Sequence, residues 1–289
     1  MDKFTPLLAK EFSRREEHIE NILRLLDEGN TVPFIARYRK EMHGTTDDQT
    51  IRAIADRLAY LRGLDERKSA VVSAIEAQGK LTDELSAAIE NAQTLAEVED
   101  IYRPYKQKRR TRATIAREKG LAPLAELLLS QTVTSGTLEA LAAPYVNEEK
   151  EVMSTDDALA GAGDIIAETI SDDAAIRAAL RRLYRTRGVL WAKAATDEDS
   201  VYRLYYDYRE PVSRVQGHRV LAVNRGEREG MLKAGVEIED ALALQEIRRA
   251  VFRGISISNA FVNACCEDAW RRLIEPSAER EIRGELTDA

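Results

Sequence analysis

The sequence predicts an all-α, multihelical fold in two subdomains, with room for a small β element near residues 201–238. The chain of 289 residues is long enough for two modest domains. Ala, Leu, Glu and Arg are frequent and only 6% of residues are aromatic, a mixture that favours helices. Three pairs of polar residues have the spacing of helix capping boxes: Ser13 with Glu16, Thr46 with Gln49, and Thr94 with Glu97.

The expected helices follow one another from the N-terminus. Behind Ser13, apolar residues recur at the helical period until Gly29, and Pro33 suits the first turn of a second helix. Behind Thr46, a longer apolar stripe predicts a helix that ends at Gly79 and that Gly63 could bend. Shorter helices are expected around residues 85–89, 95–102, 124–129, 138–143, 165–170 and 176–184.

The pattern changes after Trp191. Apolar residues at 202, 204, 206 and 208 alternate with other residues, a period closer to that of a strand, and glycines surround the apolar run 220–223. These features place any strands within residues 201–238. Helical signals return from Ala241, so we divide the chain into a helical domain at 1–190 and a second, mostly helical subdomain at 191–289. Residues 279–289 still read as helix with no closing Gly or Pro, and we expect the sequence to continue.

Composition and charge indicate the class of protein. The formal net charge of −7 means that a nucleic-acid contact would have to come from a local cluster of cations. Cys265 and Cys266 are adjacent, a spacing that suits neither a disulfide framework nor a metal site. There is no apolar leader at residues 1–10 and no run of about 18 apolar residues. We therefore expect a cytoplasmic protein with no membrane partner.

No group of residues predicts catalysis. The acidic pairs at 47–48, 156–157 and 172–173 each follow a Ser or Thr at a predicted helix start, where carboxylates favourably meet the helix dipole. His18, His43 and His218 have no metal-ligand spacing. Gly161 and Gly163 begin like a dinucleotide motif, but no strand precedes them. We expect no enzyme activity, no cofactor and no metal, and we interpret the two cysteines as buried apolar residues.

The strongest candidate for binding is a basic segment that follows Pro104. It has no apolar period, which predicts an exposed loop, and its cations could neutralise phosphates while Tyr105 stacks on an unpaired base. The alternative is a solvated loop that pairs with acids elsewhere in the chain. The candidate nucleic-acid-binding residues here are Tyr105, Lys106, Lys108, Arg109, Arg110 and Arg112, with Arg117 and Lys119 close behind.

A second candidate consists of Arg37, Arg39 and Lys40, just after Pro33. A helix up to Glu28, a turn, and a helix from Pro33 could form a helix-turn-helix, although the spacing is loose. A third basic cluster surrounds a predicted amphipathic helix, and we interpret it as a solvated face. It comprises Arg177, Arg181, Arg182, Arg185 and Arg187.

Several stretches together resemble the Tex family of bacterial transcription accessory proteins. They are residues 31–41 (TVPFIARYRKE), 101–106, 109–111, 113–121, 145–150, 164–168, 206–208 and 218–227, and the resemblance extends to Pro276 and Ser277. It implies a multihelical N-terminal region with a helix-turn-helix portion. An RNase H-like domain, helix-hairpin-helix elements and a C-terminal OB-type (S1-type) RNA-binding domain would follow beyond Ala289.

The resemblance also implies partners. Tex proteins are regarded as transcription accessory factors that bind nucleic acid, and they share an architecture with a eukaryotic elongation factor that travels with RNA polymerase. We therefore expect this region to bind RNA or DNA and to position the downstream domains, with RNA polymerase or the elongation machinery as a further partner. The alternative is a protein–protein docking module on the transcription machinery that does not touch nucleic acid.

Overall fold

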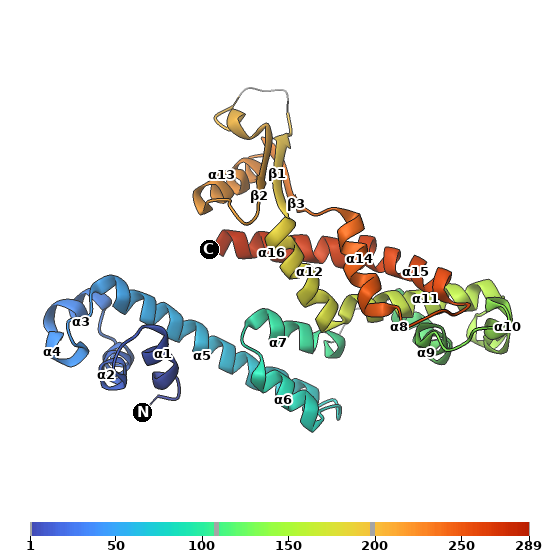
Figure 1. Ribbon diagram of the computed structural model, residues 1–289, viewed down its shortest axis with the longest axis horizontal. Coiled ribbons are helices and arrows are strands. Elements are labelled where there is room, and N and C mark those ends of the chain that lie inside the picture. Colours follow the sequence, from blue (N-terminus) through green and yellow to red (C-terminus); the bar gives the residue numbers. More distant parts are fainter. Residues whose placement is uncertain (1, 107–109, 197–199, 289) are drawn as a thin grey trace. The chain divides into compact units, whose positions relative to one another are not determined.

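The computed structural model describes residues 2–106, 110–196 and 200–288. Helices dominate it, as Figure 1 shows, and a small antiparallel sheet completes it, so the predicted fold class is confirmed. The chain forms two compact units, unit 1 (Met1–Glu99) and unit 2 (Asp100–Ala289). The boundary that we expected after residue 190 lies within unit 2 and stays a prediction.

Unit 1 begins with a small helical bundle. Leu8, Ile19, Ile22, Ile35 and Ile51 are fully buried in its core. The helices of this unit are α1 (Thr5–Glu11), α2 (Glu16–Asp27), α3 (Val32–Tyr38), α4 (Lys40–His43), α5 (Asp48–Glu76), α6 (Asp83–Asn91) and the first half of α7 (Leu95–Tyr102). The long predicted helix is α5, whose 29 residues span about 43 Å without a break at Gly63.

The predicted capping boxes have mixed outcomes. The box at Thr94 is confirmed in part: Thr94 Oγ1 accepts from the Glu97 N–H at 3.2 Å, whereas Glu97 accepts from the N–H of Gln93 at 2.6 Å and not from that of Thr94. The box at Thr46 is wrong by one residue. Asp47 caps α5 by accepting from the Thr50 N–H at 2.8 Å, a role that its carboxylate fills well at the positive helix end.

The box at Ser13 is also wrong. Ser13 has a left-handed backbone, with φ of 52°, and α2 starts after Arg15 without a side-chain cap. The acidic pair at 156–157 lies at the start of α11 (Thr155–Asp172) as expected, but in the pair at 172–173 only Asp173 lies at a helix start, that of α12 (Ala174–Arg187), and Asp172 is the last residue of α11. Ser154 caps α11, with Asp156 and Asp157 in its first turn, and Asp173 caps α12 by accepting from the Ile176 N–H at 2.9 Å.

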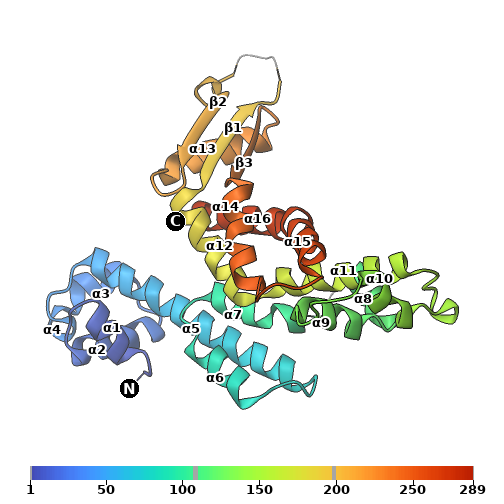
Figure 2. The same cartoon turned by 45° about the vertical axis from the view of Figure 1, so that its right-hand side comes forward.

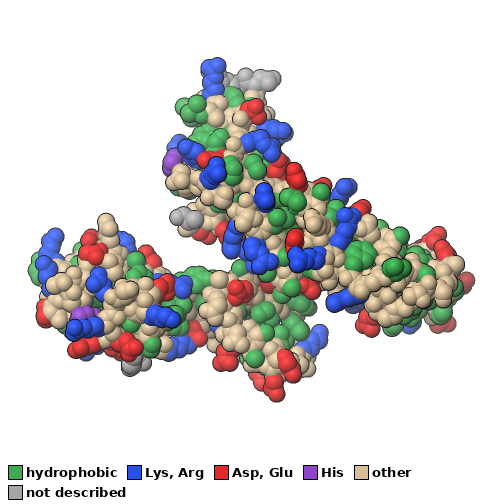
Figure 3. All heavy atoms as spheres, viewed as in Figure 1, with side chains coloured by type: hydrophobic (Ala, Val, Ile, Leu, Met, Phe, Trp, Pro, Cys, Tyr) green, Lys and Arg blue, Asp and Glu red, His purple; other side chains and the backbone are tan. Residues whose placement is uncertain are grey.

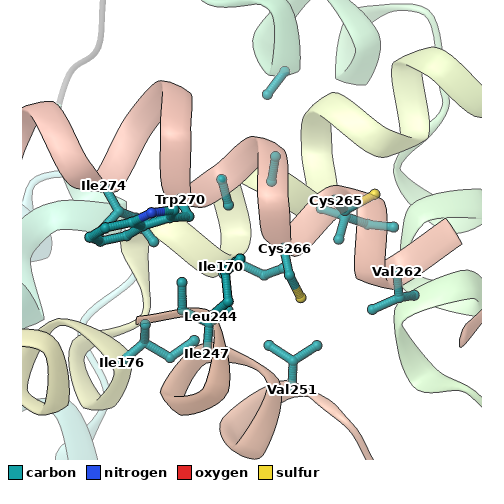
Figure 4. Packing of buried hydrophobic residues seen from close by; sticks show 14 of the residues in the cluster. Ile170, Ile176, Leu244, Ile247, Val251, Val262, Cys265, Cys266, Trp270 and Ile274 are labelled. Carbon is teal, nitrogen blue, oxygen red and sulfur yellow. The ribbon is translucent and has the colours of Figure 1, made fainter. Parts of the chain in front are cut away.

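Unit 2 is built around α11 (Thr155–Asp172), which packs against α8, α9 and α15. Its core includes Trp270, Tyr184 and Cys266, and Figure 4 shows Trp270 and Cys266 among aliphatic side chains. The other helices are α8 (Arg112–Glu118), α9 (Ala122–Ser130), α10 (Leu138–Ala142), α12 (Ala174–Arg187), α13 (Gly217–Arg228), α14 (Asp240–Val251), α15 (Asn259–Asp268), the π-helical segment η5 (Ala269–Ile274) and α16 (Glu275–Asp288). Short 3-10 turns are η1 (Arg103–Tyr105), η2 (Ala143–Tyr145), η3 (Glu148–Lys150) and η4 (Arg203–Tyr205).

The two cysteines are buried on α15, as we interpreted them. Burial raises the pKa of the Cys265 thiol to about 12 and that of Cys266 to about 11. A thiol with so high a pKa is a poor nucleophile at neutral pH, because only the thiolate reacts.

The sheet has the strand order β2-β1-β3, with β1 (Val189–Ala194) antiparallel to both β2 (Asp207–Pro211) and β3 (Leu232–Glu237). α13 packs on one face of it (Figure 2). The predicted range of 201–238 contains β2 and β3 but not β1, which directly follows α12. The alternating tyrosines lead through η4 into β2, and the apolar run 220–223 belongs to α13.

The buried side chain of His43 connects three segments of unit 1 by hydrogen bonds. Its side chain is fully buried, its Nε2 donates to the Ile35 carbonyl at 3.0 Å, and its Nδ1 accepts from the Thr46 N–H at 3.0 Å. This pairing requires the neutral ring with its proton on Nε2. His43, at the end of α4, thereby connects the middle of α3 to the segment that leads into α5.

Replacing His43 with Ala should destabilise unit 1 by about 1–3 kcal/mol, because the buried Thr46 N–H loses its partner and the Ile35 carbonyl keeps only its bond from the Arg39 N–H. Thermal and denaturant melts followed by circular dichroism measure this effect. The matched control is His218→Ala, since His218 is exposed and its loss should change stability little. Equal stability of the two variants would show that the hydrogen bonds of His43 do not stabilise unit 1.

Candidate nucleic-acid interface

The basic segment starts at the end of η1. Tyr105 is half-buried and Lys106 is exposed, with its ammonium 5.7 Å from the centroid of the Tyr102 ring. A cation at that distance is attracted by the electron-rich face of the ring. Two of the predicted binding residues, Lys108 and Arg109, lie outside the described residues.

The expectation of an exposed loop is wrong from Arg112 onward, where the chain is helical. Thr111 caps α8 by accepting from the Thr114 N–H at 3.0 Å. Ala113 and Ala116 are buried against unit 2's core. These alanines are too small to produce an apolar stripe that stands out in the sequence, and so the helix was missed. Arg112 lies exposed in the first turn of α8.

Ion pairs neutralise part of the basic segment. Arg110 pairs with Glu118 at 2.9 Å on the surface. Arg117 pairs at 2.6 Å with Glu168, a residue of α11 that is nearly buried. Glu168 also accepts from the Thr111 hydroxyl at 3.1 Å. Arg117 therefore attaches α8 to α11, whereas Arg112 has no ion-pair partner among the described residues.

A surface hollow of about 290 Å³ lies beside α8. Cations from Arg112 and Lys119 line it together with the carboxylates of Glu151, Asp157 and Asp164. Burial raises the pKa of Asp164, while the charges of Arg272 and Arg112 oppose that rise. The carboxylates would repel a phosphate inside the hollow. Arg112 is therefore better placed to contact a phosphate that lies over the outer surface of α8.

The second basic candidate lies where α3 gives way to α4. Arg37, Arg39 and Lys40 are all exposed, and none of them has an ion-pair partner among the described residues. Arg37 and Lys40 line a surface hollow of about 510 Å³ together with the carboxylates of Asp47 and Asp48 at the start of α5, so a phosphate would contact these cations from outside the hollow. α2, a short turn and α3 follow one another as expected, but their role as a DNA-binding helix-turn-helix stays a prediction.

An exposed aromatic pair accompanies these cations. The rings of Phe34 and Tyr38 lie 5.3 Å apart, and the two residues are 39% and 63% exposed. Neither Phe34 nor Tyr38 was among the candidate binding residues chosen from the sequence. The spacing of four residues on one short helix, next to arginines, was the signal that could have identified both.

The third basic cluster is not simply a solvated face. Arg177 and Arg181 are buried, which the amphipathic pattern did not predict. Arg181 donates to Asp100 at 2.7 Å and to Glu281 at 2.5 Å, and Arg177 donates to Ser277 at 2.7 Å and to Glu281 at 3.2 Å. Arg182 and Arg187 are exposed as expected, and Arg185 pairs with Glu285 at 2.8 Å.

Positive and negative side chains are interspersed over the face of unit 2 in Figure 3. Among the described residues, no three His, Cys, Asp or Glu side chains are grouped as a metal ion would need. No helix in the described part of the chain is long and apolar enough to span a membrane.

Two family models match this chain. The model for the Tex-like protein N-terminal domain matches residues 2–76, and the Tex central region-like model matches residues 134–289. The chain belongs to the Tex family. The resemblance seen in the sequence is thus confirmed, and the Tex central region coincides with the part of unit 2 that carries α11, α12, the sheet and α16.

Relatives from distant organisms support this assignment to the Tex family. The chain is 44% identical to the uncharacterised protein YdcI of Bacillus subtilis, over 97% of this chain and 40% of that protein. It is 38% identical to the transcriptional accessory protein Tex of Neisseria gonorrhoeae, over 99% of this chain and 38% of that protein. A human protein named S1 RNA-binding domain-containing protein 1 is 29% identical over 92% of this chain and 28% of its own length. The chain thus spans two fifths or less of the length of these Tex relatives.

Replacing Asp100 with Ala should destabilise unit 2 by about 3–5 kcal/mol, because it leaves the buried Arg181 guanidinium short of a partner. Burial raises the pKa of Asp100 even though Arg181 opposes the rise, which indicates how strongly both groups are desolvated. The matched control is Glu118→Ala on the exposed pair with Arg110 in unit 2, which should cost about 0–1 kcal/mol. Urea titration of both variants measures the difference, and similar midpoints would argue against the buried pair's importance.

Proposed function

We propose that this chain binds nucleic acid, RNA or DNA, without catalysis, as the N-terminal region of a transcription accessory factor. In this role it positions the downstream nucleic-acid-binding domains. Its membership of the Tex family supports a role in transcription, because relatives bear the name transcriptional accessory protein. The name of the human relative refers to RNA binding, which supports the choice of ligand.

The observation that carries the proposal is the presence of exposed cations without acidic partners in an acidic chain. Some exposed arginines of the chain pair with a carboxylate, as Arg110 and Arg117 do. Arg37, Arg39 and Lys40 do not, and they stand beside the exposed Phe34 and Tyr38 rings. Cations next to aromatic rings suit a ligand that combines phosphates with unpaired bases.

The rival function is docking of another protein of the transcription machinery without nucleic-acid contact. The exposed Phe34 and Tyr38 pair favours it, since aromatic residues with Arg are also common at the centres of protein interfaces. The two functions differ in their response to salt. Phosphate contacts release counterions and give a steep salt dependence, whereas a protein interface has no such obligatory term.

Replacing Lys108, Arg109, Arg110 and Arg112 together with Ala should weaken binding of single-stranded RNA uniformly across sequences. Each phosphate contact on a single strand contributes a slope of about −0.7 in log K against log salt, so the slope should flatten by roughly 1 to 3 units. Fluorescence anisotropy titrations at several salt concentrations measure it. Arg110 already pairs with Glu118, so the lower end of that range is reached if Arg110 contributes little.

A charge-matched control keeps this test specific. Four exposed cations elsewhere in unit 2 can be replaced instead: Arg182, Arg187, Arg214 and Arg228. This control should retain most of the affinity and slope. If the basic-segment variant behaves like the control, the segment is a solvated surface and the RNA contacts lie elsewhere on the chain. If the wild-type chain itself does not bind RNA, the docking function is preferred.

The purified chain should not hydrolyse RNA or DNA in the presence of magnesium or manganese. The acidic pairs serve helix ends, where Asp157 accepts from the Met153 N–H at 3.1 Å and Asp173 caps α12. Gel assays with labelled oligonucleotides measure hydrolysis. Activity that co-purifies with the chain and disappears in Asp156→Asn or Asp172→Asn would overturn the non-catalytic assignment.

A further inference from the structure

The β-sheet of unit 2 has one covered face and one open face. Leu190, Ala192 and Val236 point to the covered face, where they join hydrophobic clusters that include residues of α13. α16 covers the free edge of β3, since Arg283 donates to the Ala234 carbonyl and Glu279 accepts from the Val236 N–H at 3.4 Å. Because side chains alternate along a strand, Trp191 and Lys193 point to the opposite face.

Trp191 is held on this open face in a fixed position. It lies directly across from Gly235 on β3, and a Cβ added at Gly235 would come within 3.0 Å of three atoms of the indole. The ring therefore lies flat over the glycine backbone, which only a residue without a side chain permits. Among the described residues, Trp191 is only partly buried and belongs to neither hydrophobic cluster of the sheet.

Two lysines stand beside the ring without acidic partners. Lys193 and Lys233 are direct neighbours across β1 and β3, both are exposed, and neither forms an ion pair among the described residues. Like charges directly opposite each other destabilise a sheet, so packing alone does not account for this pair. The Lys193 ammonium lies 5.8 Å from the centroid of the Trp191 ring. On the other side of Trp191, Arg209 is held by Glu237.

A supported aromatic ring next to unpaired cations is the arrangement that stacks an unpaired base and contacts its flanking phosphates. Neighbouring strands lie about 4.8 Å apart, so the two ammonium groups are within reach of one nucleic-acid backbone. Bases inside a duplex are stacked on one another and do not offer a free face to the indole. The chemistry of this surface therefore selects single strands.

We propose that the open sheet face is a stacking site for single-stranded nucleic acid, in which Trp191 holds one base and Lys193 and Lys233 contact adjacent phosphates. The site is distinct from the basic segment and from the α3–α4 cations. This proposal rests on the proposed function, which supplies nucleic acid as the class of ligand. It adds a preference for single strands and names Trp191 as the residue on which a base stacks.

The two tryptophans allow a direct test with the whole chain. Trp270 is fully buried and donates to Asp240 at 2.9 Å, so a ligand reaches only Trp191. Titration with an oligouridylate should quench part of the tryptophan emission, and a duplex of equal length should not. The Trp191→Leu variant, which retains Trp270, should lose the quenching and bind the oligouridylate about 5- to 150-fold more weakly. Trp191→Phe should recover much of that affinity.

Salt dependence separates this site from the basic segment. Trp191→Leu should leave the salt slope unchanged, because stacking releases no counterions, whereas Lys193→Gln with Lys233→Gln should flatten the slope by up to about 1.4 units. Melting temperatures identify any loss of folding. If Trp191→Leu lowers the melting temperature but affinity per folded molecule is unchanged, the ring only covers Gly235 and the stacking site is overturned.

The remaining outcomes are also decisive. Binding of the oligouridylate by the wild-type chain without quenching overturns the stacking site and leaves the proposed function standing. Equal quenching by the duplex overturns the selection of single strands. Failure of the wild-type chain to bind any oligonucleotide overturns both proposals.

Discussion

Two buried guanidinium groups organise unit 2. Arg177 and Arg181 are desolvated on α12, and such charges are tolerated only with well-placed partners. Those partners come from the start of the unit, through Asp100, and from its last helix, through Ser277 and Glu281. α12 runs directly into β1, and α16 in turn covers the edge of β3. The hydrogen-bond network around the two buried arginines therefore also helps to position the sheet relative to the helices of unit 2.

The arginines and lysines of this chain fall into two groups. Some form ion pairs that connect helices, and others are exposed and have no acidic partner. Arg117, Arg177 and Arg181 each meet carboxylates that are themselves wholly or partly buried, and they connect helices. The exposed cations on α3 and α4 and on the open sheet face have no such partners among the described residues. Each of these two groups stands beside exposed or partly exposed aromatic rings. These cations can therefore be replaced without removing an ion pair that connects helices.

The sequence predicted what depends on near neighbours. The stripe from Ile51 to Ile75 was enough for α5, and Asp156 and Asp157 were placed correctly at a helix start because a cap lies within a few residues of the groups it satisfies. Long-range partners were not predictable. Arg181 finds Asp100 across 81 positions and Glu281 across 100, so an amphipathic pattern alone suggested a solvated face. β1 was missed for the same reason, since a short strand directly after a helix is recognised only through its pairing with β2 and β3.

The π-helical segment Ala269–Ile274 determines the angular position of everything that follows it. α15, this segment and α16 form one uninterrupted helical run from Asn259 to Asp288. Each residue turns an α-helix by about 100°, and the wider π turn holds roughly one residue more than an α turn. With one residue fewer, α16 would rotate by about 100° about its own axis. Ser277 and Glu281 would then face away from α12, and Glu279 away from β3. The length of this one turn thus orients one surface of α16 toward α12 and another toward β3.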